Sequence, residues 1–288
     1  MKNFSSILFV SVVSIAAITV VAALFGIVFF VSSESLKAIK EVGTDLFSSN
    51  WYPVWSEPEF GISTMLLNTL LLTLWTSLWV WIIGVICAFY LHHFANENEK
   101  KIILRTLEYV SSIPSVVLGF FGVVVVGPML LNLGAWTAQN FLNASIMLAV
   151  LTLPYMTSLS YQSFEKVPKE IIEGCISLGA RDLHLMYVEM RHALPGIVNA
   201  MMLVFNRILG ETMIVLMVAG GANILPRSFF DPIRPLTAAL GSEIGEVEVG
   251  SLHYSSLFFI GFLLLMCSLL LNILTNCLVR KTERWVKG

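Results

Sequence analysis

The chain has 288 residues, of which 57% are hydrophobic and 12% charged, a balance typical of a protein solvated mainly by lipid. Its formal net charge of −2 argues against a nucleic-acid partner, which would need a basic face. The four cysteines show no CxxC or Cys/His ligand spacing, so the sequence predicts neither a disulfide framework nor a metal site.

Six apolar runs are long enough to cross a bilayer. The first run is longer than the apolar core of a secretory signal, so we expect an uncleaved helix. The predicted spans cover residues 7–31, 64–91, 110–133, 144–163, 197–218 and 255–279. The sequence therefore predicts an all-α integral membrane protein with a single transmembrane domain over residues 1–288.

The distribution of lysine and arginine predicts the orientation. One predicted side carries twelve of these residues, namely Lys2 and those that follow the second, fourth and last spans, and the other side carries four. The positive-inside rule then places both termini and residues 165–197 in the cytoplasm, with outer segments at 32–63 and 219–254. Trp51, Trp55 and Trp136 fall near outer span ends, where we expect them to anchor the interface.

The third span opens with IPSVVLGFFG. Pro114 interrupts the backbone hydrogen-bond ladder, and Gly119 and Gly122 allow a neighbouring helix to approach closely. Ordinary helix packing and a moving gate both fit this pattern. Among the outer residues, Arg227 and Arg234 could receive an anion or be solvated, and Glu243 is expected in a solvated acidic patch or in contact with a partner.

Residues 165–197 form a charged segment between two apolar spans. Pro168 suits the first turn of a helix, Gly179 suits a helix end, and a second helical run is expected from Arg181 to Leu194. The expected apolar side of this second run is Leu183, Met186, Tyr187, Met190 and Leu194. Charges of both signs interrupt the apolar side: Glu173, Arg181, Asp182, Glu189 and Arg191. This mixture favours a protein-docking surface over a connector held in the lipid interface.

Arg207 lies inside the fifth span, about 15 Å past Ile197 in a hydrocarbon core about 30 Å thick. A charge at that depth costs about 2.5–3.5 kcal/mol, so it should face a partner or a water-filled path. Glu211, at i+4, could form a structural ion pair with Arg207 or orient an oxyanion that the guanidinium binds. Asn206 and Thr212 fit either the path or interhelical hydrogen bonds.

The charged segment carries a resemblance to a known family. Glu173, Gly174, Cys175 and Gly179 resemble the EAA-x-x-x-G loop of ABC importer permeases, with Gly174 and Cys175 in place of two alanines. Arg191 and His192 stand where that loop usually has Leu-Pro. The resemblance implies the type I, MetI-like permease fold and a loop that docks in a cleft of a cytoplasmic ATPase.

Further stretches resemble the PstC family of phosphate permease subunits. NRILGETMIVLMVAGG resembles its R-A-x-G-E-T-M signature, IPSVVLGFFG resembles its IPSVVYGL stretch, and WYPVWSEPEFGI and GSLHYSSLFFIG resemble two outer segments. The resemblance implies phosphate import across a bacterial inner (plasma) membrane. It also implies a heterodimer with a PstA-like subunit, a PstB-like ATPase dimer and a PstS-like phosphate-binding protein.

The chain shows no G-x-x-x-x-G-K-[ST] motif, so we expect ATP and Mg²⁺ to be bound by the partner ATPase and no cofactor by this chain. No nucleophile–base constellation stands out, and we expect a transport subunit rather than an enzyme. The alternatives are a permease for another oxyanion, such as molybdate, sulfate or phosphonate, and a stand-alone secondary transporter.

Overall fold

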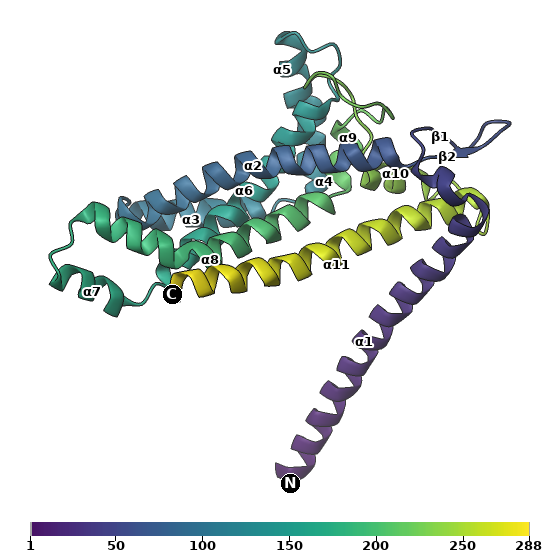
Figure 1. Ribbon diagram of the computed structural model, residues 1–288. Coiled ribbons are helices and arrows are strands. Elements are labelled where there is room, and N and C mark those ends of the chain that lie inside the picture. The colour runs from purple at the N-terminus through teal and green to yellow at the C-terminus, as the bar shows by residue number, and fades with distance from the viewer. Residues whose placement is uncertain (1, 288) are drawn as a thin grey trace.

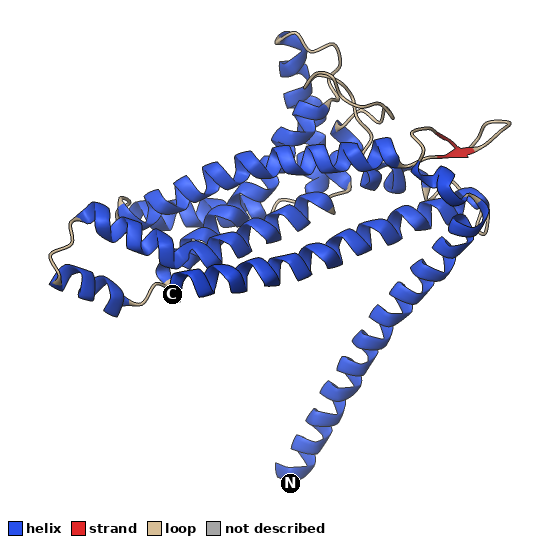
Figure 2. Cartoon of the chain, viewed as in Figure 1, coloured by secondary structure: helices blue, strands red, loops and turns tan. Residues whose placement is uncertain are grey.

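The computed structural model describes residues 2–287 and is built almost entirely of helices (Figure 1, Figure 2). The elements are α1 (Lys2–Glu41), the 3-10 turn η1 (Gly43–Phe47), β1 (Trp51–Tyr52), β2 (Glu59–Phe60), α2 (Ser63–His93), α3 (Glu97–Ser111), α4 (Ser115–Phe121), the π-helical turn η2 (Gly122–Val126), α5 (Gly127–Asn132), α6 (Phe141–Glu165), α7 (Lys169–Ser177), α8 (Asp182–Leu209), α9 (Met213–Val218), α10 (Leu236–Glu243) and α11 (Leu252–Lys287).

Six helical segments in the described part of the chain are long and apolar enough to cross a membrane, which confirms the number of predicted spans. They are Phe9–Glu41, Ser63–His93, Ser115–Asn132, Phe141–Glu165, Asp182–Leu209 and Leu252–Val286. The boundaries differ in places. The first helix continues past Val31 to Glu41, and the second helical run of the charged segment is continuous with the fifth span through Pro195.

The third span begins later than predicted because a separate amphipathic helix precedes it. Asn96 and Glu99 form a capping box that starts α3, with the Glu99 N–H donating to Asn96 Oδ1 at 3.0 Å. This helix ends at Ser111, and Pro114 occupies the N-cap of α4. The spanning segment is therefore Ser115–Asn132.

The bundle is formed by α2, α6, α8 and α11, which run side by side in Figure 1. Its core includes Leu72, Leu148, Met156, Ile197 and Val204. Small residues bring the backbones close, since a Cβ built on Gly84 would lie 2.5 Å from Met156 Cγ. Dense packing of this kind leaves the helices able to move mainly as rigid units.

The α4–α5 segment points away from the bundle axis (Figure 1). A Cβ on Gly119 would lie 2.8 Å from Met217 Sδ, and one on Gly122 would lie 2.7 Å from Val218 Cγ1. These distances confirm that both glycines admit a close neighbour, which is α9. Asn143 Nδ2 of α6 donates to the Gly122 carbonyl oxygen at 2.9 Å, at the start of the π-helical turn.

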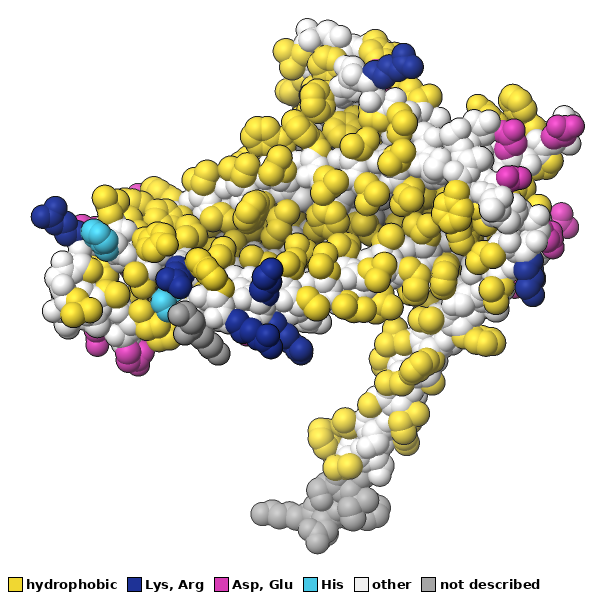
Figure 3. Space-filling model, in the orientation of Figure 1, with side chains coloured by type: hydrophobic (Ala, Val, Ile, Leu, Met, Phe, Trp, Pro, Cys, Tyr) yellow, Lys and Arg dark blue, Asp and Glu magenta, His cyan; other side chains and the backbone are white. Residues whose placement is uncertain are grey.

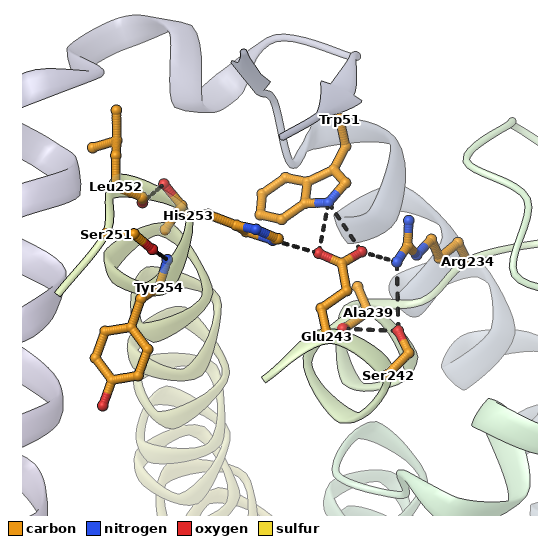
Figure 4. A network of polar contacts seen from close by, with 10 residues as sticks. Trp51, Arg234, Ala239, Ser242, Glu243, Ser251, Leu252, His253 and Tyr254 are labelled. Atoms are coloured by element: carbon orange, nitrogen blue, oxygen red, sulfur yellow. Dashed lines mark hydrogen bonds and ion pairs between the residues drawn. The ribbon is translucent and has the colours of Figure 1, made fainter. Parts of the chain in front are cut away.

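A half-buried polar network lies where β1, α10 and the start of α11 meet (Figure 4). Glu243 of α10 accepts from Trp51 Nε1 at 3.1 Å, lies 2.7 Å from His253 Nε2 and pairs with Arg234. Trp51 is only 3% exposed, so the prediction that it anchors the interface is wrong. Glu243 is half-buried and paired within the chain, which does not fit the solvated alternative. The network instead ties β1, α10 and the start of α11 together. Trp55 and Trp136 are exposed, as interfacial anchors would be.

The first helix stands apart from the bundle. It contacts α11, and Figure 1 shows it diverging from the other spans toward its N-terminal end. Its apolar side chains are largely exposed, including Phe25 and Phe29 at 73% and 76%. Apolar side chains also cover most of the visible bundle surface (Figure 3), as lipid or partner helices require.

Candidate functional site

The charged segment 165–197 forms a knob at the end of the bundle where the chain also ends (Figure 1). The knob consists of α7 and the first turns of α8. Its apolar side chains Ile176, Leu178, Leu183 and Tyr187 are 55%, 90%, 79% and 66% exposed. Apolar side chains that project from a charged segment indicate a surface that a partner covers.

The predicted coupling residues lie on this knob. Glu173, Gly174 and Gly179 are exposed and Cys175 is half-buried. Gly179 has φ +77°, its N–H donates to the Ile176 carbonyl at 2.9 Å, and the Ala180 N–H donates to the Cys175 carbonyl at 3.0 Å. These are the two hydrogen bonds of a Schellman motif, which ends α7 and sets its direction relative to α8.

Two of the five charges expected on the docking face are directed inward instead. Glu189 is 7% exposed, with Oε2 lying 3.0 Å from His93 Nε2 of α2. The Arg191 guanidinium lies 4.5 Å from the Trp285 ring centre and donates to the Trp285 carbonyl at 3.2 Å. The expectation is wrong for these residues because this side of α8 faces α2 and α11.

The fifth span is discontinuous. The first part, α8, ends at Leu209, and α9 begins at Met213. Glu211 Oε1 accepts from the N–H groups of Met213 and Ile214 at 3.2 and 3.4 Å, so its carboxylate caps α9. Thr237 of α10 donates to the Glu211 carbonyl at 2.9 Å. Non-helical backbone inside a membrane needs such partners, and α10 supplies one.

Of the two alternatives for Arg207 and Glu211, the structural i+4 ion pair is not formed, because the helix ends between the two residues. The guanidinium carbon of Arg207 instead lies 4.7 Å from the ring centre of Tyr155, on α6. A cation over an aromatic face is stabilised without using its N–H donors. No described residue of the chain forms an ion pair or side-chain hydrogen bond with Arg207, so its planar fork of donors is available to a ligand.

The other two predicted path residues, Asn206 and Thr212, contact different helices. Asn206 Nδ2 donates to Asn272 Oδ1 of α11 at 3.4 Å, and Ser268 Oγ donates to Asn206 Oδ1 at the same distance. These contacts fit the interhelical alternative. Thr212 packs against α10, where a Cβ on Gly241 would lie 2.8 Å from Thr212 Cγ2. The structure therefore does not bring the four predicted path residues into one cluster.

Tyr155 was not predicted as a site residue. A phenol directly after Pro154 in an apolar span is a signal that could have identified it. Its contact with Arg207 joins two helices that are far apart in sequence, and no local spacing reveals such a contact.

Comparison with known proteins identifies the family. The family described as "Binding-protein-dependent transport system inner membrane component" matches residues 81–288. The chain belongs to this family. It is therefore a permease, the membrane-spanning subunit of an ABC importer, and an integral membrane protein with several spans.

Individual relatives agree with this assignment. This permease is 30% identical to the probable ABC transporter permease protein YqgH of Bacillus subtilis (strain 168), over 93% of this chain and 88% of that one. It is 27% identical to the phosphate transport system permease protein PstC of Haemophilus influenzae, over 96% of this chain and 94% of that one. The expected resemblance to PstC permeases is confirmed.

Solved structures confirm the fold. A chain of the inward-facing MetNI methionine ABC transporter matches with a TM-score of 0.60 and 19% identity, covering 75% of this permease and 93% of that chain. At that identity the match supports the architecture alone. The predicted all-α, MetI-like permease fold is thus present, and an ATPase and a binding protein are the partners that an importer permease requires.

A matched pair of glycine substitutions tests the geometry of the knob. Gly179→Ala should weaken binding of the ATPase about 5- to 30-fold, because a left-handed conformation costs an alanine about 1–2 kcal/mol and α7 would reorient. A Cβ on Gly174 meets nothing within 4 Å, so Gly174→Ala should leave binding unchanged. Titration of the purified permease with its ATPase measures both, and equal affinities for the two variants would contradict the role of Gly179.

Proposed function

We propose that this permease forms the translocation path of an ATP-driven phosphate importer. The observation that carries the proposal is the Arg207 guanidinium, which lies inside a spanning segment on the face of Tyr155, with no carboxylate of the described chain paired to it. A guanidinium binds two oxygens of a phosphate through parallel N–H donors. The similarity to PstC permeases supports phosphate as the anion that is carried.

The proposed assembly has four kinds of subunit. The permease pairs with a PstA-like subunit, and each permease subunit presents a knob such as 165–197 to one copy of a PstB-like ATPase, which binds ATP and Mg²⁺. A PstS-like binding protein delivers phosphate to the opposite side. The exposed apolar side chains of the knob support this arrangement, as does the clustering of basic residues in 165–197 and at the C-terminal end.

The discontinuity after Leu209 suggests how movement reaches the anion. Glu173, Gly174, Cys175 and Gly179 transmit closure of the ATPases to α8, which is continuous from the knob to Arg207. A displacement of the knob thus moves the guanidinium directly. Glu211 stays with α9 because it caps that helix, so the distance between Arg207 and Glu211 changes as access alternates.

Substrate competition tests the proposal. We expect ATP-driven uptake of labelled phosphate into proteoliposomes that contain the assembled importer, with external sulfate, molybdate or phosphonate failing to compete. Competition by one of these anions at concentrations comparable to phosphate would assign the permease to another oxyanion importer and leave its subunit class unchanged.

A further inference from the structure

Two histidines and a glutamate meet where the knob joins the bundle. His92 and His93 are the last two residues of α2, and Glu189 comes from α8. One ligand atom from each of the three lies within 4.8 Å of those of the others. Nitrogen and carboxylate donors in this number are typical of sites for divalent transition metals.

The polar atoms of this cluster are buried but not satisfied by one another. Glu189 is 7% exposed, and its Oε2 lies 3.0 Å from His93 Nε2. The two atoms are within ion-pair distance, but both are buried without a hydrogen-bond partner in the described structure. A buried carboxylate is unfavourable without a cationic partner, and a metal ion bound between the two groups would supply one to the carboxylate and accept the imidazole lone pair at the same time.

The spacing of the donor atoms suits such a cation. His93 Nε2 and His92 Nε2 lie 3.0 and 3.7 Å from the two oxygens of Glu189. Zinc binds nitrogen and oxygen ligands at about 2.0–2.2 Å, which in a tetrahedral site places neighbouring ligand atoms about 3.3 Å apart. Both pairs are close to this separation.

A fourth residue orients one of the ligands. His92 Nδ1 lies 3.2 Å from Glu165 Oε1, at the end of α6. With Nδ1–H donating to this carboxylate, the lone pair of Nε2 points toward Glu189. A carboxylate that fixes the tautomer of a histidine ligand is the usual second shell of a zinc site. Phe164 stacks on His92 with ring centres 5.5 Å apart and shields this side from water.

We propose that His92, His93 and Glu189 bind a divalent transition-metal ion of the zinc class, with Glu165 orienting His92. Three protein ligands leave a fourth position for water. The ligands come from α2 and α8 and the orienting residue from α6, so no local sequence spacing reveals the site.

A bound ion would clamp the base of the knob. Glu165 and Glu189 both belong to the segment 165–197, whereas His92 and His93 belong to α2. The ion therefore ties α8, which is continuous with the knob, to the end of α2. This consequence rests on the proposed function, because it slows transport only if the knob moves during the cycle.

Metal titration of the purified permease–ATPase complex, after chelator treatment, tests the site. We expect calorimetry to find one Zn²⁺ site per permease with a dissociation constant of about 1 μM or below. His93→Gln and Glu189→Gln should each weaken it at least 100-fold, and Glu165→Gln about 10- to 100-fold. His184→Gln changes an exposed histidine of the same segment and should leave the affinity unchanged.

Two further measurements separate the outcomes. The Co²⁺-substituted complex should show the visible absorption of a tetrahedral site without a thiolate band, which excludes binding by cysteine. Each metal-free variant should elute from a size-exclusion column as the intact complex. This elution shows that the loss of metal binding is not caused by unfolding. Wild-type affinity in both His93→Gln and Glu189→Gln would overturn the proposal. The titration does not depend on transport, so failure of the phosphate assignment would leave its result intact.

Discussion

Arg207→Gln is expected to abolish ATP-driven phosphate uptake, lowering the initial rate at least ~100-fold while the complex still assembles. Glutamine removes the charge and the planar fork of donors that bind the anion. A hydrogen bond to a charged group contributes about 1.5–3 kcal/mol, and the loss of two such bonds corresponds to roughly 100-fold or more in rate. Uptake of labelled phosphate by proteoliposomes measures the effect.

Matched variants separate charge from structure. Arg105→Gln removes an exposed arginine of α3, away from the outer segments, and should retain uptake. Arg207→Lys keeps the charge without the bidentate fork and should fall between wild type and Arg207→Gln. Tyr155→Phe keeps the aromatic face and should be mild, whereas Tyr155→Leu should impair uptake. Disappearance of the Arg207→Gln subunit from the membrane would instead show that Arg207 is structural.

Glu173→Lys is expected to abolish coupling to the ATPase, with membrane insertion intact. Glu173 is exposed on α7, where a reversed charge disturbs no contact within the chain but would repel a docked partner. ATP hydrolysis stimulated by the loaded binding protein should fall to the level of the uncoupled ATPase. Co-purification of the ATPase with the permease gives a second readout of docking.

The control for this variant is Glu108→Lys, which makes the same charge change at an exposed position of α3, outside the knob. We expect it to retain stimulated hydrolysis. Normal transport by Glu173→Lys would show that the knob does not dock through α7. Equal loss in both variants would show a general charge effect rather than a specific surface.

The sequence predicted the spans well because apolar length is a local property. It missed the break after Leu209, because the apolar run resumes at Met213 and the short polar interruption at Gly210, Glu211 and Thr212 was taken as part of one span. The continuity of α8 through Pro195 was also missed, because a proline normally argues for a boundary. Trp51 looked interfacial by position, but its environment depends on Glu243, which is distant in sequence.

In the candidate site, too, local features could be predicted from the sequence and contacts between distant segments could not. A lone arginine in an apolar span is conspicuous, so Arg207 could be selected from the sequence. Its contact with Tyr155 and the separation from Glu211 follow from the packing of α6 and from the end of α8. Glu189 was expected on the surface, but it is buried because it packs against His92 and His93 of α2. The sequence alone does not show which side of α8 faces α2.

Stimulation of ATP hydrolysis in the reconstituted importer tests the central claim most directly. The complex would be presented in turn with phosphate-, sulfate- and molybdate-binding proteins, each loaded with its own anion. The account predicts stimulation by the phosphate-loaded protein alone. Stimulation only by the sulfate- or molybdate-loaded protein would contradict it, and the permease would then carry that oxyanion instead.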